Sequence, residues 1–492
     1  MEKVEWSDVQ GLVLSGYPRL AQSAYVLWRF RPGRRDAAKQ WLGSLAGRLM
    51  RASALDADDI DAGADTPPTH IQALKSAPHH DMRAVNIALT SHGLRQLAVD
   101  DSVLNAFSVE FLEGMAPKPG KDDAIPRRSN LLGDLGDSLP QAWDWGGWET
   151  NSDIDGVLLL YAADETLLQS LLDDELAAMA DAADPIRTAS QPGNAPPALR
   201  AQVYPDRKEH FGYTDGISQP IIERSPHAEK GDMHSDPTKR IHFVKPGEFV
   251  LGYKNERRVQ AVGTQSVEGL RRNGSYLVLR QLEQDVAAFK GFVADAATRL
   301  QCAPEEIAAK LLGRLPAGNP LVPPGDGTPD KPDRNDFLYY FGDRFGLKCP
   351  VGAHIRRANP RDANKAPDPD TGLGLSKMHR IIRRGRMYGE RFDPAKPDSG
   401  GDTGRGILFL CLNADIAGQF EMIQHSWLNN RHFGDLHVGT DPLGHYAADG
   451  GTIVIQHRPS NIVLERPKPF VRVKGGAYFF LPGIAAVRAF GR

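Results

Sequence analysis

The feature that most constrains the fold is an alternation of short apolar runs with helix-like stretches, which occurs twice along the chain. Residues 25–30 (YVLWRF) have the composition of a buried strand, and residues 35–51 place apolar side chains on one face of a helix. The other elements expected in the first half are strands at 85–90, 156–161 and 199–204, a short helix from His92 capped by Ser91, and a helix at 165–180.

The second half repeats this alternation. The elements expected there are strands at 275–282, 380–384, 406–412 and 477–481, helices at 284–300 and 416–428, and a last short helix. Strand–helix–strand units used twice predict an α+β sandwich duplicated within one chain. At 492 residues the chain is also too long for one ordinary core, so we expect two domains, residues 1–205 and 206–492.

Three stretches rich in Pro, Gly and Asp interrupt these elements. The stretch at 114–152 contains Trp143, Trp145 and Trp148, which predicts an ordered insertion that packs onto the body of the protein. The stretches at 224–238 and 316–336 are expected to be loops.

Composition narrows the class of protein. Lys and Arg number 59 against 62 for Asp and Glu, giving a net charge of -3, which argues against a nucleic-acid binder. Cys302, Cys349 and Cys411 form neither a zinc spacing nor the CxxCH of covalent haem attachment. No apolar run is long enough for a membrane span, and the first residues lack an export signal. We therefore expect a cytoplasmic protein without a membrane partner, and the sequence leaves a homo-oligomer open.

One segment with potential chemistry is 211–220 (FGYTDGISQP). Gly212 and Gly216 flank Asp215, so the backbone around this carboxylate can turn tightly. Taken alone, the segment is equally typical of a turn in which Asp215 caps the next element.

A second segment is 348–361 (KCPVGAHIRRANPR). His354 follows a Pro-Val-Gly-Ala turn, and histidine is a common ligand of haem iron. The nearby Arg356 and Arg357 suit the carboxylates of a porphyrin, because a guanidinium pairs bidentately with a carboxylate. By itself, one histidine among 15 is more typical of a structural or surface residue.

The third segment is 381–389 (IIRRGRMYG). In a strand, Arg383 and Arg384 point to opposite faces, so one of them can enter a pocket. The simpler interpretation is a solvated basic patch.

Together these segments resemble the dye-decolourising peroxidases. The order is characteristic of that family: the GxxDG loop, GSYLVLRQL at 274–282, CPVGAHIRRANPR, RIIRRGRMYG and then GILFLCLNADIAGQFEMIQHSWLNN. The opening DVQGLVLSGY and the stretch VNIALTSHGL resemble the first domain of the family. The resemblance covers nearly the whole chain and is greatest to the longer branch of the family.

The resemblance implies two ferredoxin-like domains, with one non-covalent haem b per chain held mainly by the second. It implies that Asp215 is the distal acid/base, Arg383 the distal arginine and His354 the proximal iron ligand. Arg280 and Arg356 are then candidates for haem propionates, and Asp415 is a candidate partner of the proximal imidazole. Some relatives have Asn two residues after the distal arginine, where this chain has Gly385, so an amide contact to peroxide is missing.

The implied function is a haem peroxidase that reduces hydrogen peroxide and oxidises dyes, phenols or another organic reductant. A carboxylate can move a proton between the two peroxide oxygens, and a guanidinium can stabilise the charge that develops. One alternative is a haem carrier or haem-handling protein without efficient turnover, which needs neither Asp215 nor Arg383. Another reads the Arg356–Arg357 and 380–386 clusters as a surface for phosphate or nucleic acid.

Overall fold

The computed structural model describes most of the chain in detail. The described residues are 3–55, 82–120, 125–150, 153–189, 191, 195–226, 228, 241–260, 269–322, 335–364, 366–393, 404–446 and 450–492.

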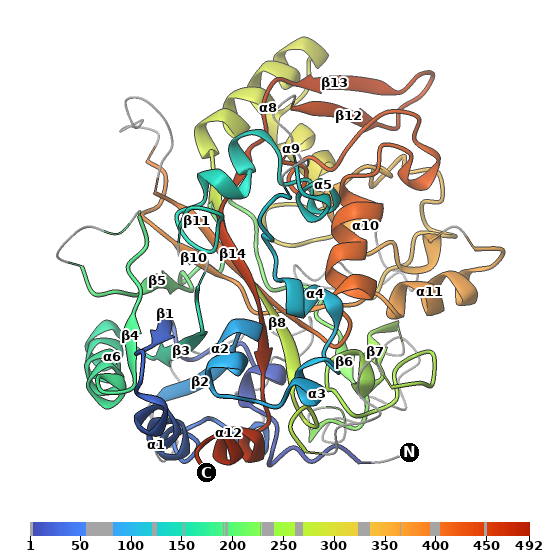
Figure 1. Ribbon diagram of the computed structural model, residues 1–492. Helices are drawn as coiled ribbons and strands as arrows, with labels where there is room; N and C mark the ends of the chain where they lie inside the picture. The colour runs from blue at the N-terminus through green and yellow to red at the C-terminus, as the bar shows by residue number, and fades with distance from the viewer. Residues whose placement is uncertain are drawn as a thin grey trace, which may run out of the picture.

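A ten-stranded sheet organises the molecule. Its strands are β1 (Gln22–Phe30), β2 (Arg83–Leu89), β3 (Gly156–Ala162), β4 (Ala183–Pro185), β5 (Leu199–Gln202), β8 (Ser275–Gln284), β9 (Ile382–Arg383), β10 (Arg386–Tyr388), β11 (Gly406–Asn413) and β14 (Val471–Leu481). The pairs among them are antiparallel. Figure 1 shows β8 and β14 crossing the centre of the molecule.

Each half of the sheet has the strand order of a ferredoxin-like fold. The first half runs β5-β1-β3-β2, and the second runs β14-β8-β11-β9. In both halves the first and third strands lie in the middle and are flanked by the fourth and second. The α+β class with two ferredoxin-like units agrees with the sequence analysis, whereas the domain boundary near 205 stays a prediction.

The two halves join into a closed ring. Phe480 on β14 pairs with Leu89 on β2, and Met387 on β10 pairs with Gln202 on β5. Because β10 also pairs with β11, the path of paired strands returns to its start. The sheet therefore has an inner face and an outer face.

Alternate residues of each strand supply two separate apolar cores. On β1, Tyr25 and Leu27 belong to the inner core, whereas Val26 and Trp28 belong to the outer core beneath the helices. Both cores contain residues from the first and second halves of the chain. Burial of both faces explains why the strands read as continuous apolar runs.

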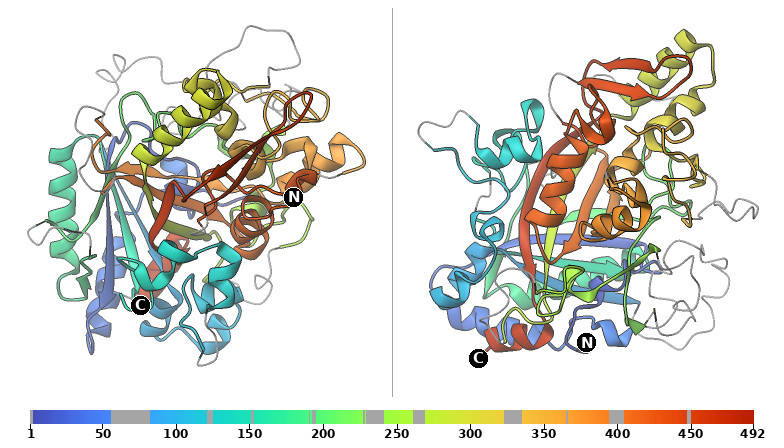
Figure 2. Two further views of the ribbon diagram at one scale, coloured as in Figure 1. Left: turned by 90° about the horizontal axis from the view of Figure 1, so that it is seen from above. Right: turned by 90° about the vertical axis from the view of Figure 1, so that its right-hand side faces the viewer.

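Helices cover the outer face (Figure 2). Their bounds are α1 (Arg35–Leu45), α2 (Ser91–Gln96), α3 (Asp101–Leu104), α4 (Val109–Glu113), α5 (Arg127–Leu132), α6 (Glu165–Met179), α8 (Val286–Leu300), α9 (Pro304–Leu312), α10 (His354–Ala358), α11 (Pro369–Lys377) and α12 (Ile484–Phe490). Two small sheets complete the structure, formed by β6 (Ile221–Ile222) with β7 (Phe243–Val244) and by β12 (Gly451–Ile455) with β13 (Ile462–Arg466).

Three local expectations need correction. The cap of α2 is Thr90, whose hydroxyl accepts the N–H of Gly93 at 3.0 Å, so the helix begins one residue earlier than expected. The helix expected at 35–51 ends at Leu45. The stretch expected to be one helix at 416–428 forms two π-helical segments, Ala417–Glu421 and Ile423–Leu428, a rare conformation.

The tryptophan-rich insertion packs down as predicted. Trp143, Trp145 and Trp148 are buried, and the indole N–H of Trp145 donates to Oε1 of Gln281 on β8 at 2.8 Å. The loops expected at 224–238 and 316–336 lie partly outside the described residues. Among the residues that are described, no helix is long and apolar enough to cross a bilayer.

Candidate functional site

Asp215 lies in a tight loop between β5 and β6. Gly212 and Gly216 on either side of it have φ values of 99° and 81°, in the region that favours glycine. The main-chain N–H of Asp215 donates to the carbonyl of Arg207 at 3.0 Å. The Glu209 carboxylate accepts the N–H groups of Phe211 and Tyr213 at 2.8 and 2.9 Å. The loop thus presents a partly exposed carboxylate on a fixed backbone.

Arg383 reaches this carboxylate from β9. It pairs with Cys411 of β11, so its side chain is directed to the outer face of the sheet. Arg383 Nη1 donates to Asp215 Oδ1 at 3.2 Å, and the two side chains are 35% and 26% exposed. Arg384 reaches the opposite way to the carbonyls of Leu12 and Val13, which confirms the predicted division between the two arginines.

His354 is the first residue of α10 and has one free ring nitrogen. Its Nδ1 lies 3.0 and 3.1 Å from the two carboxylate oxygens of Asp441. Asp441 is buried and also accepts the N–H groups of Leu443 and Gly444 at 2.8 and 2.6 Å. The His354 side chain is 32% exposed, and no described residue hydrogen-bonds its Nε2. Asp441 therefore fixes the ring and leaves Nε2 available to a ligand.

These groups lie within electrostatic reach of one another. Burial lowers the pKa of His354, but the charge and hydrogen bond of Asp441 more than offset this, so the pKa lies above its ordinary value. Arg383 and Asp215 make smaller contributions of opposite sign to the pKa of His354. The charges of Asp215 and Arg383 are therefore near enough to His354 to influence its pKa.

The His354 imidazole fits a metal whose other ligands come from a cofactor rather than from the protein. Among the described residues, no three His, Cys, Asp or Glu side chains gather as a cage for a metal ion. In a haem site, the protein supplies one imidazole as iron ligand, and a carboxylate often accepts the other ring N–H of that imidazole. The site could accordingly hold haem through His354.

Comparisons with known proteins point to one family, although no family model matches the chain. The multifunctional dye peroxidase DyP2 of Amycolatopsis is 33% identical over 300 residues, which are 58% of this chain and 61% of that relative. The dye-decolorizing peroxidase msp1 of Mycetinis scorodonius is 28% identical over 463 residues, which are 85% of this chain and 79% of the relative. The match thus spans less than two thirds of the first relative's length.

Solved structures extend the likeness over the whole chain. An ancestral D-type dye decolorizing peroxidase matches with a TM-score of 0.75 and 25% identity over 99% of both chains. The chain is similar to dye-decolourising peroxidases in both sequence and fold. A fungal DyP-type peroxidase from Auricularia auricula-judae shares the fold, with a TM-score of 0.74 and 23% identity over 100% of both chains.

Asp415 is not the carboxylate that holds His354, contrary to the expectation from the sequence. Asp415 does not contact His354, and its carboxylate accepts the N–H of Gly418 at 2.8 Å at the start of the first π-helical segment. Asp441 holds the imidazole instead. It was missed because 87 residues separate it from His354, and the sequence offers only an Asp in a Gly-Thr-Asp-Pro turn as a signal.

Arg280 was expected to contact a haem propionate, but it is 1% exposed and forms an ion pair with Asp134 of the insertion. Its guanidinium also lies over the rings of Trp143 and Tyr446, with 5.8 and 5.5 Å to the centroids. Arg280 thus joins the insertion to β8, and the structure assigns it no open surface.

Arg356 is also buried rather than directed at a cofactor. Its Nη1 donates to the carbonyls of Asp343 and Cys349, each at 2.9 Å, and the guanidinium stacks on Tyr339 at 4.4 Å. Arg357 binds the carbonyls of Trp427 and Gly439 at 2.6 and 2.8 Å. Both arginines therefore brace α10, because an inward guanidinium satisfies main-chain carbonyls as readily as carboxylates.

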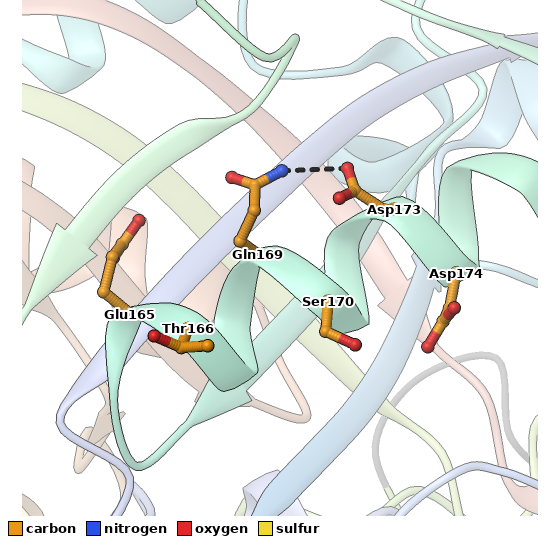
Figure 3. A pocket seen from close by; sticks show the side chains of 6 residues that line it. All are labelled: Glu165, Thr166, Gln169, Ser170, Asp173 and Asp174. Carbon is orange, nitrogen blue, oxygen red and sulfur yellow. Dashed lines mark hydrogen bonds between the residues drawn. The ribbon is translucent and has the colours of Figure 1, made fainter.

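A shallow hollow elsewhere on the molecule takes no part in the candidate site. Figure 3 shows that polar side chains of α6 line it, and none of the predicted site residues does. In Figure 1, α6 lies at the left and α10 at the right. The lining residues are Glu165, Thr166, Gln169, Ser170, Asp173 and Asp174.

Proposed function

We propose that this protein is a haem peroxidase that reduces hydrogen peroxide and oxidises dyes, phenols or other small reductants. The observation that carries the proposal is the Asp215–Arg383 pair, held at 3.2 Å within electrostatic reach of His354. Relatives named as dye peroxidases support the same activity.

The proposed cofactor is one non-covalent haem b per chain, bound mainly by the second half. His354 would hold the iron through Nε2, and the chain has no CxxCH for covalent attachment. Haem supplies the redox chemistry, because it accepts the oxidising equivalents of peroxide and takes electrons one at a time from the reductant.

The protein's own groups handle the proton and the charge. The Asp215 carboxylate would accept a proton from one peroxide oxygen and return it to the departing one. The Arg383 guanidinium would orient peroxide and stabilise the negative charge that develops. Asp441 accepts the Nδ1 proton of His354, which makes the imidazole a stronger electron donor through Nε2.

The alternatives explain less of this geometry. A haem carrier gains nothing from the Asp215–Arg383 pair. A surface for phosphate or nucleic acid is disfavoured because Arg356, Arg357, Arg380, Arg384 and Arg386 are buried. A cytoplasmic location and a homo-oligomer remain predictions.

The first test is the absorption spectrum of the haem-reconstituted protein before and after one equivalent of hydrogen peroxide. We expect a Soret band that shifts with peroxide, and a lost or altered band in His354→Ala. Equal peroxide turnover in the wild type and Arg383→Ala would favour the carrier. Absence of any Soret band would revive the basic-surface interpretation.

A further inference from the structure

Three arginines converge on the two residues that follow the Asp215-Gly216 turn. Arg383 Nη2 donates to the carbonyl of Ile217 at 2.6 Å, and Arg380 Nη2 donates to the carbonyl of Ser218 at 2.9 Å. Arg361 Nη2 donates to the hydroxyl of Ser218 at 3.3 Å. The loop that carries the candidate proton acceptor is thus held at consecutive acceptors by three guanidinium groups.

The backbone at Ser218 has a conformation that is unfavourable for a residue with a side chain. Ser218 has φ of 68°, in the left-handed region that costs a side-chain-bearing residue about 1 kcal/mol or more. The hydrogen bonds from Arg361 and Arg380 both end on this residue. These hydrogen bonds oppose relaxation of the Ser218 backbone. Such a relaxation would displace Asp215, which lies three residues earlier in the chain.

Arg361 and Arg380 are themselves held in place by burial and by other hydrogen bonds. Arg361 is buried, donates to the carbonyls of Asn335 and Phe337 at 2.7 and 2.9 Å, and stacks on the Phe337 ring at 3.9 Å. Arg380 is buried as well, and its own carbonyl accepts Nε2 of Gln419 at 2.5 Å. The Arg361 guanidinium and the Arg380 main chain are therefore each held by other residues as well as by Ser218.

This arrangement is costly in electrostatic terms. Burial, together with the charges of Arg361 and Arg383, lowers the pKa of Arg380 to about 9. Burial also lowers the pKa of Arg361. Two buried arginines next to the partly exposed Arg383 oppose folding unless acceptors compensate their charges. Such a local conflict is typical of a functional position.

We propose that Arg361 and Arg380 are positioning residues: through Ser218 they hold Asp215 at hydrogen-bonding distance from Arg383. The inference rests on the proposed function, because it concerns how the acid/base group is aimed. Neither arginine is a catalytic residue, since each acts through Ser218, Arg361 on its hydroxyl and Arg380 on its carbonyl.

The test is a double-mutant cycle between Arg380→Ala and Asp215→Asn, measured as the second-order rate constant of the haem-loaded protein with hydrogen peroxide. Arg380→Ala alone should lower this constant by about 10²-fold, the size expected for misplacing a reacting group by about 1 Å. In the Asp215→Asn background the same change should cost no more than about twofold, because groups that act as a unit are not additive. The KM for the reductant should stay unchanged.

Two milder variants keep the proposal testable if Arg380→Ala does not fold. Ser218→Ala removes only the hydroxyl that Arg361 contacts, and it should lower the peroxide rate constant with the same dependence on Asp215. Arg380→Lys retains a cationic donor and should fall between Arg380→Ala and the wild type. In the haem-free chain, Arg380→Ala should speed amide exchange at Asp215, whose N–H is bonded to Arg207.

Arg386→Ala is the matched control. Arg386 is a buried arginine from the same segment that donates to the carbonyls of Leu20, Gly16 and Tyr17, away from Asp215. Its effect should multiply with that of Asp215→Asn. Multiplicative effects for Arg380→Ala would overturn the positioning role and leave the peroxidase proposal intact. An unchanged peroxide rate in Asp215→Asn would overturn both.

Discussion

Arg383 and Asp215 are 168 residues apart in the chain, yet Nη1 of the arginine lies 3.2 Å from Oδ1 of the aspartate. The contact joins the end of a short strand to a glycine-flanked loop, so it depends on the packing of two separate segments. A second bond from Arg383 to the carbonyl of Ile217 fixes the guanidinium plane against the loop.

Loss of either member of this pair should slow the reaction with peroxide. Removing one preorganised charge-stabilising group costs about 10²–10³-fold in rate, so we expect losses of that size for Asp215→Asn and Arg383→Leu. Stopped-flow absorption of the haem-loaded protein measures the rate. Arg384→Lys is the control, because Arg384 lies on the opposite side of the strand and contacts Leu12 and Val13. Unchanged rates in both variants would exclude the assigned roles.

Asp441→Asn should weaken the hold on haem, whereas Asp415→Asn should not. The first change removes the charge behind His354, and losses of outer ligands of this kind cost about 10–100-fold in affinity. Its haem iron should also have a higher reduction potential, since the imidazole becomes a weaker donor. The second change only alters a cap on Gly418, worth about 1 kcal/mol. Haem titration followed by potentiometry distinguishes the two variants, and identical results for both would contradict the assignment of Asp441.

Asp134→Ala should destabilise the folded state by about 3–5 kcal/mol, because it leaves the buried charge of Arg280 without its partner. The double variant Asp134→Ala with Arg280→Met should recover part of this loss. Urea unfolding of the haem-free protein measures both free energies. A loss below about 1 kcal/mol would mean that Arg280 finds another partner.

The stability of the fold should fall between pH 4.5 and 7 through Glu248. Burial raises the pKa of this carboxyl from 4.5 to about 7, although the N–H of Glu256 donates to it at 2.9 Å. The folded state therefore retains a proton that the unfolded chain releases above pH 4.5, so this contribution is complete below 4.5 and is lost as the pH rises to 7. Its size is on the order of 3 kcal/mol. Unfolding free energies across this range should be less pH-dependent in Glu248→Gln, and equal slopes would refute the effect.

The strands could be predicted because each depends on local sequence, whereas the roles of the site residues came from a resemblance to a family and stay predictions. Apolar runs such as 156–161 remain strands wherever they are buried, and β3 extends over Gly156–Ala162. Asp215, His354 and Arg383 stand in short motifs that carry their own turn and strand signals.

The partners of buried charges could not be predicted. Arg280 and Arg356 were assigned to haem carboxylates, but a guanidinium binds Asp134 or the carbonyl of Cys349 with the same donors. The contact of Asp441 with His354 depends on how a turn distant in the sequence packs against α10. In each case tertiary packing determines which partner the charged group has, and such packing produces no periodic pattern in the sequence.

The ring of strands has a consequence for how the chain stays soluble while it folds. Each half, taken alone, would present unpaired N–H and C=O groups along its outermost strands, and such strands recruit other chains. In the complete protein β14 covers β2 and β10 covers β5, each through a short seam. Each half of the chain therefore covers edge strands of the other half. Breaking the β14–β2 and β10–β5 pairings would expose aggregation-prone edge strands on both halves at once.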